Sequence, residues 1–414
     1  MDLEAFDLTI EGLLGRIPAG DRYPVRVMAV INLGEESFYK GSVASPDGLL
    51  ERAWALLDEG ADMIDLGAVS TAPGSPSITM ERERERLIPA LSLLRDNMDV
   101  EISVDTQRSD LADCALSRGA SCVNDVSGLL DPDMASTIAD HDASLVIMAS
   151  RRRPGDILRM KDIIRLLAER LDIACEAGIS RERIIVDPGV GRWIPEKGFE
   201  HDLAILDGLE RLRVLERPVL AALSRKSFIG TVLDLPSPTD RLAGSLAAAA
   251  IAVYNGAHIL RTHDVARSLD AITLARAVRG RPAEALRPGI EVEVLERSGH
   301  RDDMQCRLKG VGAGEGALVH LGVKGAFRLI SLKGISSMEA LIIKQEMLAR
   351  GGDAAISREA LRCAKLPQTV LIMGTLAQIM GLSKKLRLQP FDLPVVAEAL
   401  EEALDGDEDV QRYR

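Results

Sequence analysis

Residues 183–189 read RIIVDPG, a run of branched apolar residues that stops at an aspartate. The same pattern recurs through the first two thirds of the chain, where short apolar runs end at polar residues able to do chemistry. Continuous apolar strands of this kind are typical of a parallel sheet buried on both faces. The eight runs are VRVMAVIN (25–32), MIDLGAVST (63–71), EISVDT (101–106), CVNDVSG (122–128), SLVIMAS (144–150), RIIVDPG (183–189), VLAALSRK (219–226) and AHILRTHD (257–264).

These runs are separated by segments with helical character, such as 47–60, 81–97, 110–119, 161–178, 203–215 and 241–255. Eight alternating strand and helix units predict a (β/α)8 TIM barrel in the α/β class. In that fold the functional site lies at the C-terminal ends of the strands. Those ends are Asn32, Thr71, Asp105, Asn124, Met148, Asp187, Lys226 and the pair Arg261 and His263.

The pattern changes near residue 284, so the sequence predicts a barrel over 1–284, a smaller α+β domain over 285–404 and a disordered tail over 405–414. For the second domain we predict strands at IEVEVLE, MQCRLKGV, ALVHLGV and FRLISL, all within 290–332. A helix over 337–350 should stop at Gly351 and Gly352. A buried strand over 370–373 and helices over 376–385 and 393–403 complete the prediction.

Composition excludes several classes of protein. With 51 basic and 63 acidic side chains the net charge is −12, which argues against a nucleic-acid binder. No apolar run is long enough for a membrane span, and the first twenty residues do not resemble a signal peptide. Five cysteines without a CxxC pair argue against a disulfide framework or a zinc site. We expect a cytoplasmic protein.

Three polar strand ends suggest a ligand. Asp105 and Asp187 are carboxylates that can each accept two parallel N–H bonds, and Asn124 offers both an acceptor and donors. Together they suit a flat heterocycle with ring and amino donors, and Lys226 can donate to its carbonyl. The alternative is that each is a buried structural hydrogen-bonding residue. Alternation turns Asp125 to the other side of its strand, which favours a structural role there.

Arg261 and His263 share one face of the last strand because they are two residues apart. Together with Ser224, Arg225 and Lys226 they favour a phosphate or pyrophosphate site, since the loops after strands seven and eight are the usual anion site of this fold. The sequence contains no nucleophile–base arrangement, HExxH motif or Walker loop.

These motifs resemble the dihydropteroate synthase family over residues 25–280. VINLGEESF, SVDT, NDVSG, VDPG, LSRKSFIG, GSLAAAA and RTHDV stand in the order and at the spacing of that family. The resemblance implies that a hydroxymethyl-dihydropterin diphosphate condenses with an arylamine such as p-aminobenzoate and releases pyrophosphate. It also implies a homodimer.

The resemblance further implies the role of each strand end. Asp105, Asn124, Met148, Asp187 and Lys226 would bind the pterin. Ser224, Phe38 and Thr71 would bind the arylamine. Asn32, Arg261 and His263 would bind the diphosphate, with Asn32 ligating Mg²⁺. The catalytic residues would be Arg261, His263 and Lys226. The metal and the cations would absorb the charge that develops on the leaving pyrophosphate.

Three loops depart from the family pattern: residues 34–41 read GEESFYKG, residues 70–74 read STAPG without the usual arginine, and Met148 is followed by Ala149, Ser150 and Arg151 to Arg153. Because Lys40 and the arginine run add positive charge, we expect a phosphorylated arylamine to be preferred over p-aminobenzoate. The alternative is that the run is a solvated loop. Segments in the last 120 residues, IIKQEMLARGGDAAISREAL and LIMGTLAQ, resemble an accessory domain fused to some synthases.

Two other functions remain open from sequence. A methyltetrahydrofolate-dependent methyltransferase with a corrinoid partner would use a similar barrel without a diphosphate grip. A non-catalytic pterin-binding protein would keep Asp105, Asn124 and Asp187 but would not need Arg261.

Overall fold

The chain forms two compact units that divide between Arg279 and Gly280. The computed structural model describes residues 9–34, 48–68, 78–279, 284–298, 301–362 and 366–405. The division lies a few residues before the expected boundary at 284/285, because β11 (Glu284–Arg287) already pairs with the sheet of the second unit. Asp405 still belongs to the last helix, and the rest of the expected tail lies outside the described residues.

The first unit is a barrel of eight parallel strands, as the sequence predicts. The sheet order is β8-β7-β6-β5-β4-β3-β10-β9, and a parallel bridge between Val186 and Val219 joins its two ends. The strands are β3 (Arg26–Asn32), β4 (Met63–Gly67), β5 (Glu101–Asp105), β6 (Cys122–Asp125), β7 (Ser144–Met148), β8 (Ile184–Asp187), β9 (Leu220–Ala222) and β10 (Ile259–Thr262).

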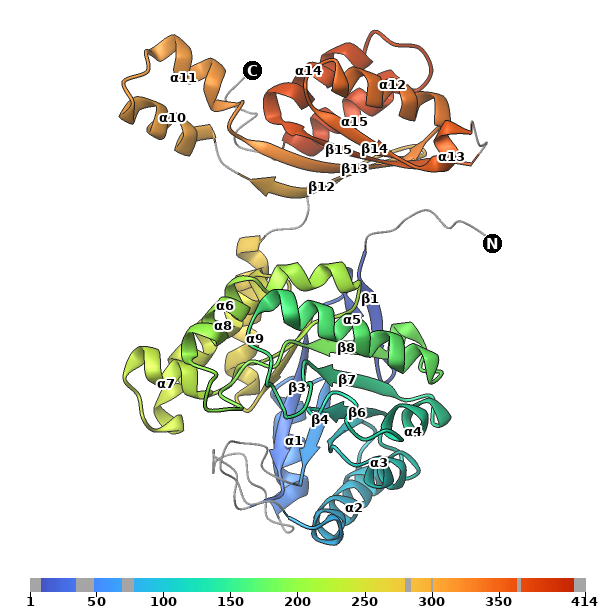
Figure 1. Ribbon diagram of the computed structural model, residues 1–414, viewed down its shortest axis with the longest axis vertical. Helices are drawn as coiled ribbons and strands as arrows, with labels where there is room; N and C mark the ends of the chain where they lie inside the picture. Colours follow the sequence, from blue (N-terminus) through green and yellow to red (C-terminus); the bar gives the residue numbers. More distant parts are fainter. Residues whose placement is uncertain are drawn as a thin grey trace. The chain divides into compact units, whose positions relative to one another are not determined.

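Helices surround this barrel (Figure 1). Outward-facing strand residues such as Ile64 and Val104 share one apolar core with helix residues such as Leu87 and Leu91. The helical elements are α1 (Leu49–Asp58), α2 (Met80–Asn97), α3 (Ser109–Leu116), α4 (Met134–Asp140), α5 (Met160–Glu176), η3 (Arg181–Arg183), α6 (Phe199–Asp207), η4 (Leu209–Leu215), α7 (Ser227–Leu233), η5 (Pro238–Arg241), α8 (Leu242–Tyr254) and α9 (Val265–Arg279).

Inward-facing residues form a second core whose polarity changes along the barrel. Near the strand starts they are apolar and buried, and toward the strand ends they become polar, as in β4, where Met63 is followed by Asp65. Because side chains alternate along a strand, every second residue belongs to this interior column. The apolar set comprises Met28, Met63, Cys122, Val146, Ile185, Leu220, Ala222 and Ile259.

An N-terminal hairpin that we did not predict from sequence contributes to this inner core. It consists of β1 (Glu11–Leu14) and β2 (Ile17–Gly20), and Leu14 and Ala19 belong to the inner cluster. The hydroxyl of Ser144, at the start of β7, accepts from Gly15 N at 2.9 Å and donates to Leu13 O at 2.8 Å. The hairpin is therefore bound to the end of the barrel opposite the polar strand ends.

The second unit contains a five-stranded antiparallel sheet with the order β11-β12-β13-β15-β14. Apolar residues of the sheet and of α12, α14 and α15 form its core, and Figure 1 shows these helices against the sheet. Its remaining elements are β12 (Ile290–Ser298), α10 (Arg301–Gly310), α11 (Glu315–Gly322), β13 (Phe327–Ile335), α12 (Ser337–Leu348), β14 (Asp353–Ile356), α13 (Arg358–Leu361), β15 (Gln368–Thr375), α14 (Leu376–Leu386) and α15 (Leu393–Asp405).

Two strand predictions in this unit are wrong. MQCRLKGV and ALVHLGV lie largely in the helices α10 and α11, which pack against each other. Alternation in a short apolar run does not distinguish a strand from a helix. Here Arg307 and Lys309 in the last turn of α10 suit a helix C-terminus, and Gly312 adopts a positive φ of 78° just beyond it. The predictions at β12, β13, α12, β15, α14 and α15 are confirmed.

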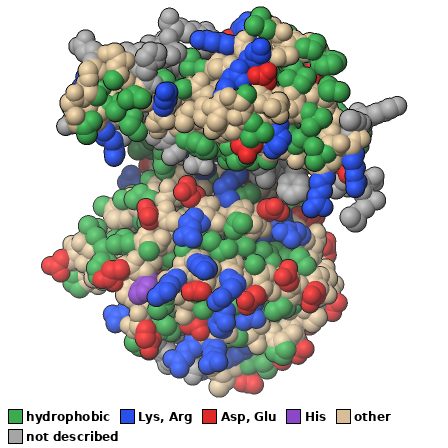
Figure 2. Space-filling view, turned by 45° about the horizontal axis from the view of Figure 1, so that its top comes forward, with side chains coloured by type: hydrophobic (Ala, Val, Ile, Leu, Met, Phe, Trp, Pro, Cys, Tyr) green, Lys and Arg blue, Asp and Glu red, His purple; other side chains and the backbone are tan. Residues whose placement is uncertain are grey.

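The surface of the barrel carries charged side chains of both signs, as expected from the 51 basic and 63 acidic residues of the chain. On the face of the barrel shown in Figure 2, basic side chains lie among acidic ones. Among the described residues, no helix is both long and apolar enough to cross a membrane.

We predict that Ser144→Ala destabilises the barrel by about 1–3 kcal/mol, because it leaves a buried N–H and a carbonyl of the hairpin without their shared partner. Urea unfolding followed by circular dichroism measures the change. The matched control is Ser136→Ala, since the hydroxyl of that exposed serine bonds only to Asp133 O. Equal stability of the two variants would show that the hairpin contact contributes nothing.

Candidate active site

Three of four neighbouring strands place a polar side chain at one level of the barrel, and the fourth places a glycine there. Asn32 of β3 is in register with Gly67 of β4, Gly67 with Asp105 of β5, and Asp105 with Asn124 of β6. A side chain at Gly67 would bring its Cβ to 3.3 Å from Asn32 Oδ1, so the glycine keeps this row open. The structure thus brings together three residues that the sequence predicted from separate motifs.

Arg261 joins this row from β10, the strand that pairs with β3. Its Nε donates to Asp65 Oδ2 at 2.7 Å, and its Nη2 donates to Asp105 Oδ2 at 2.9 Å. Asn124 Nδ2 also lies 3.4 Å from Asp65 Oδ2. Asp65 is fully buried and was missed by the sequence analysis, although a carboxylate inside the apolar run MIDLG was a usable signal.

The two carboxylates keep unused acceptor atoms. Asp65 Oδ1 and Asp105 Oδ1 are buried and have no hydrogen-bond partner among the described residues. Burial raises the pKa of Asp105 to about 7, against the opposing attraction of Arg261. Buried acceptors without partners are costly unless a ligand supplies donors. This part of the barrel is therefore suited to a ligand rich in N–H groups.

Asp187 and Lys226 meet at the loop that follows β8. Asp187 Oδ1 accepts from Gly189 N at 2.7 Å, and Lys226 Nζ donates to the carbonyl of Val190. The ammonium group of Lys226 also lies 5.4 Å from the centroid of the Trp193 ring, within cation–π range. Burial lowers the pKa of Lys226 to about 8, although Asp187 opposes this shift, and burial raises the pKa of Asp187.

Met148 completes the predicted pterin set. It is buried at the end of β7 and pairs in register with Asp187. A Cβ on Gly189 would approach Met148 Cγ to 3.3 Å, so this side chain packs against the loop after β8. Asp125, by contrast, accepts hydrogen bonds from Ser127 N, Ser127 Oγ and Leu129 N, which confirms its structural role.

Ser224 and His263 contact each other at the ends of β9 and β10. His263 Nδ1 lies 2.9 Å from Ser224 Oγ, and His263 N donates to the same hydroxyl at 3.3 Å. Burial, together with the neighbouring cations, Arg261 first among them, lowers the pKa of His263 to about 3. The imidazole is therefore neutral near pH 7 in the ligand-free protein, whereas the sequence analysis treated it as part of a cationic grip.

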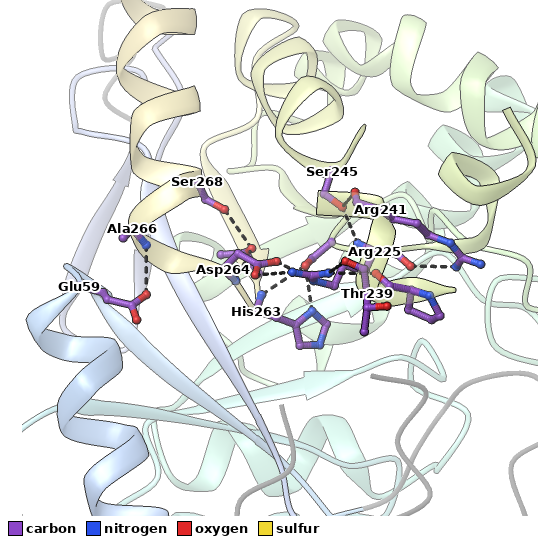
Figure 3. A network of polar contacts seen from close by, with 12 residues as sticks. Glu59, Arg225, Thr239, Arg241, Ser245, His263, Asp264, Ala266 and Ser268 are labelled. Atoms are coloured by element: carbon purple, nitrogen blue, oxygen red, sulfur yellow. Dashed lines mark hydrogen bonds and ion pairs between the residues drawn. The ribbon is translucent and has the colours of Figure 1, made fainter. Parts of the chain in front are cut away.

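A network around Arg225 fixes the two loops that carry these residues (Figure 3). The guanidinium of Arg225 forms two hydrogen bonds to Asp264, at 2.9 and 2.7 Å, and donates to the carbonyls of Pro238 and Thr239. Arg225 itself has a positive φ of 56°, an uncommon conformation for a residue with a side chain. Its buried contacts hold this turn, and the turn sets the directions of Ser224 and Lys226.

The remaining predicted residues fall into two groups. Phe38, Thr71, Lys40 and Ala72 lie outside the described residues. Arg151 to Arg153 are exposed after β7, and their three backbone N–H groups all donate to the carboxylate of Asp156. The backbone N–H groups of the arginine run are thus already bound to a carboxylate of the protein. The preference for a phosphorylated arylamine stays a prediction.

Comparisons with known proteins agree with this geometry. The family model described as pterin binding enzyme matches residues 28–263. The chain is similar to the dihydropteroate synthase of Bacillus subtilis, with 40% identity over 243 residues, covering 58% of this chain and 83% of the relative. It is also similar to the dihydropteroate synthase of Escherichia coli, with 31% identity over 259 residues, covering 61% and 90% of the two chains.

Solved structures give the same result. The structure of Xanthomonas albilineans dihydropteroate synthase with 4-aminobenzoic acid matches with a TM-score of 0.59 and 34% identity, covering 66% of this chain and 100% of that chain. The same enzyme in complex with 7,8-dihydropteroate matches with a TM-score of 0.56 and 31% identity, with coverage of 66% and 100%.

We predict that His263 stays neutral from pH 8 down to pH 5, because its lowered pKa lies below that interval, whereas an ordinary histidine with a pKa of about 6.5 becomes protonated within it. The measurement is a titration of histidine ring resonances by NMR, with the His263 signal assigned by its loss in His263→Asn. A signal that titrates with a midpoint near 6.5 would contradict the buried, neutral state.

Proposed function

Because the chain belongs to the pterin-binding enzyme family and, within it, to the dihydropteroate synthases, we propose that it condenses 6-hydroxymethyl-dihydropterin diphosphate with p-aminobenzoate or a related arylamine. The arylamine nitrogen bonds to the pterin methylene carbon as the carbon–oxygen bond to the diphosphate breaks. Pyrophosphate leaves, and the amine nitrogen loses one proton. The observation that carries the proposal is the pair of unpartnered carboxylate oxygens of Asp65 and Asp105 beside Asn124.

In this proposal the pterin ring lies across the row at the strand ends. Its ring and amino N–H groups donate to the carboxylates of Asp105 and Asp187, and Asn124 complements its mixed donor and acceptor edge. Lys226 is mostly protonated at neutral pH and donates to the ring carbonyl. Met148 provides an apolar contact next to Asp187. Ser224 lies close to His263 and receives the carboxylate of the arylamine.

Arg261 has a more limited role toward the diphosphate than a free cation would have. Two of its nitrogens are engaged by carboxylates, and Nη1 has no partner within the described part of the chain. We assign Nη1 and the neutral imidazole of His263 as hydrogen-bond donors to the leaving pyrophosphate. Such donors stabilise the charge that develops as the carbon–oxygen bond breaks.

We propose Mg²⁺ as the cofactor, with Asn32 as its protein ligand. The amide oxygen of Asn32 is the kind of hard donor that Mg²⁺ prefers, and Mg²⁺ is commonly held by one or two protein groups together with substrate phosphates and water. The described residues include no group of three or more His, Cys, Asp or Glu side chains that could hold a metal ion. Binding would therefore depend on the diphosphate, whose charge the metal would neutralise.

We also propose that the protein is a cytoplasmic homodimer. The neighbouring helices α8 and α9 expose Ile251, Tyr254, Leu274 and Val278, and each of these side chains is about half or more exposed. Clustered exposed apolar residues favour a protein–protein contact. Cys114, Cys122 and Cys175 are free thiols, as expected in a reducing compartment.

Two rival functions make different demands on the site. A methyltransferase acting with a corrinoid partner has no use for a diphosphate grip. A non-catalytic pterin-binding protein needs Arg261 only as the partner of Asp65 and Asp105, and not as a donor to a diphosphate. The similarity to named synthases favours the condensation over both. Pyrophosphate release from a pterin diphosphate, Mg²⁺ and an arylamine separates all three functions.

We predict that Asp187→Ala weakens pterin binding by about 2 to 4 kcal/mol, because a buried charge-assisted hydrogen bond to the ring is lost. Isothermal titration calorimetry with 6-hydroxymethylpterin measures the change. Asp110→Ala, at an exposed position in the first turn of α3, serves as the control and should bind like the unsubstituted protein. A folded Asp187→Ala variant with unchanged affinity would remove Asp187 from the pterin site.

We predict that Arg261→Ala lowers the rate of pyrophosphate release at least a hundredfold, which corresponds to about 3 kcal/mol of transition-state stabilisation. A coupled phosphate assay with pterin diphosphate, Mg²⁺ and p-aminobenzoate gives the rate. Excess chelator should also abolish release by the unsubstituted protein. Normal turnover of the variant, or full activity in chelator, would contradict the leaving-group role.

A further inference from the structure

Two buried charged residues lie behind the proposed pterin site and have no part in the chemistry described so far. Lys197 is completely buried, and Asp202 at the start of α6 is 1% exposed. Lys197 Nζ lies 3.5 Å from Asp202 Oδ1. Burying two charges costs more than an apolar pair of the same volume, so a buried ion pair is not by itself a gain in stability. The pair therefore calls for an explanation other than stability.

Both residues bind the backbone of the loop that follows Asp187. Lys197 Nζ donates to the carbonyl of Gly189, and Asp202 Oδ1 accepts from Gly191 N at 2.8 Å. On its other side, the same short loop binds the site. Gly189 N donates to Asp187, and the carbonyl of Val190 accepts from Lys226. Three consecutive residues thus connect the buried pair to the two residues assigned to the pterin.

This loop has little stiffness of its own. Gly189 and Gly191 have positive φ angles of 76° and 127°, which only glycine adopts readily. A Cβ on Gly191 would lie 3.3 Å from Lys226 Cδ, so glycine is also needed for the close approach of the lysine. A flexible glycine loop holds one conformation only when contacts outside it fix its peptide groups. Here those contacts are Lys197, Asp202 and the indole N–H of Trp193, which donates to the carbonyls of Gly189 and Val190.

We propose that Lys197 and Asp202 are positioning residues that hold the loop 189–191 in the conformation in which Asp187 and Lys226 engage the pterin ring, an inference that rests on the proposed function. Lys197 fixes the carbonyl of Gly189, the same residue whose N–H binds Asp187. Asp202 fixes Gly191, along which the side chain of Lys226 lies. Neither residue touches the substrate.

The charge of Lys197 gives this role a second readout. Burial is the main cause that lowers the pKa of Lys226, Asp187 and Asp202 raise it, and Arg261 and Lys197 lower it further. Removing the charge of Lys197 alone raises the pKa of Lys226. Because Lys226 acts in its protonated form, the alkaline limb of the activity profile of that variant should move to higher pH. Loss of stability alone would not move it.

The experiment compares the unsubstituted protein with Lys197→Met, Asp202→Asn and the charge-neutral double variant, with Lys161→Met on the exposed start of α5 as the control. The probe is 6-hydroxymethylpterin in calorimetry, and steady-state assays give KM for p-aminobenzoate. We expect the folded double variant to bind the pterin about tenfold more weakly, the value of roughly one hydrogen bond to a charged group. The KM for p-aminobenzoate should stay unchanged. Asp202→Asn, whose amide oxygen can still accept from Gly191 N, should lose less affinity than Lys197→Met.

Three results would overturn the inference. The first is wild-type pterin affinity in Lys197→Met or the double variant, which would show that the loop does not need the pair. The second is a parallel loss of thermal stability and of affinity for both substrates without a shift of the alkaline limb in Lys197→Met, which would show a purely structural role. The third is a lack of pterin binding by both the unsubstituted protein and the Lys161→Met control. This result would reject the proposed function itself, and it differs from the first two results because the unsubstituted protein also fails to bind.

Discussion

The site depends on the placement of one guanidinium group between two buried carboxylates. Arg261 of β10 reaches across the barrel interior to Asp65 of β4 and Asp105 of β5. None of the three could be buried alone without a large desolvation cost, so each fixes the position of the others. Because the contacts join three strands, they also fix the level of Asn32, Asp105 and Asn124 at the ends of the strands.

The two ends of the barrel differ in their side chains: those at the N-terminal end contribute to stability, and those at the C-terminal end form the candidate site. The N-terminal end is filled by apolar side chains and closed by the hairpin, whose backbone bonds to Ser144 and Glu101. The C-terminal end retains a lysine with a lowered pKa and acceptor atoms that have no partner among the residues described by the structure. Groups of this kind are costly in a protein that binds nothing and useful in one that binds a donor-rich ring and an anion. The stability of the N-terminal end allows the C-terminal end to keep these costly groups.

The second unit is stabilised by contacts of its own. Two of its helices, α12 and α14, begin with reciprocal capping boxes, Ser336 with Glu339 and Thr375 with Gln378, and its apolar residues form a core of their own. Its polar contacts include both local and long-range hydrogen bonds. Glu339, for example, is used by the cap of α12 and by Asp392 N. The family match ends at residue 263, before this unit begins.

The sequence by itself determined the barrel, because eight apolar runs that each end in a polar residue have few other ways to be buried. It also identified Asp105, Asn124, Asp187, Lys226, Arg261 and His263, since the strand ends of such a barrel meet at one face. Only the tertiary structure decided how these residues are paired. Asp65 becomes the partner of Arg261 through a contact 196 residues apart in sequence, and no local pattern encodes such a contact. The neutral state of His263 has the same origin, because desolvation and neighbouring cations exist only once the strands are assembled. Lys197 and Asp202 resemble ordinary surface charges in the sequence, and folding alone brings them behind the loop 189–191. The hairpin and the helices α10 and α11 were missed or mistaken because short apolar segments take their conformation from the surface against which they pack.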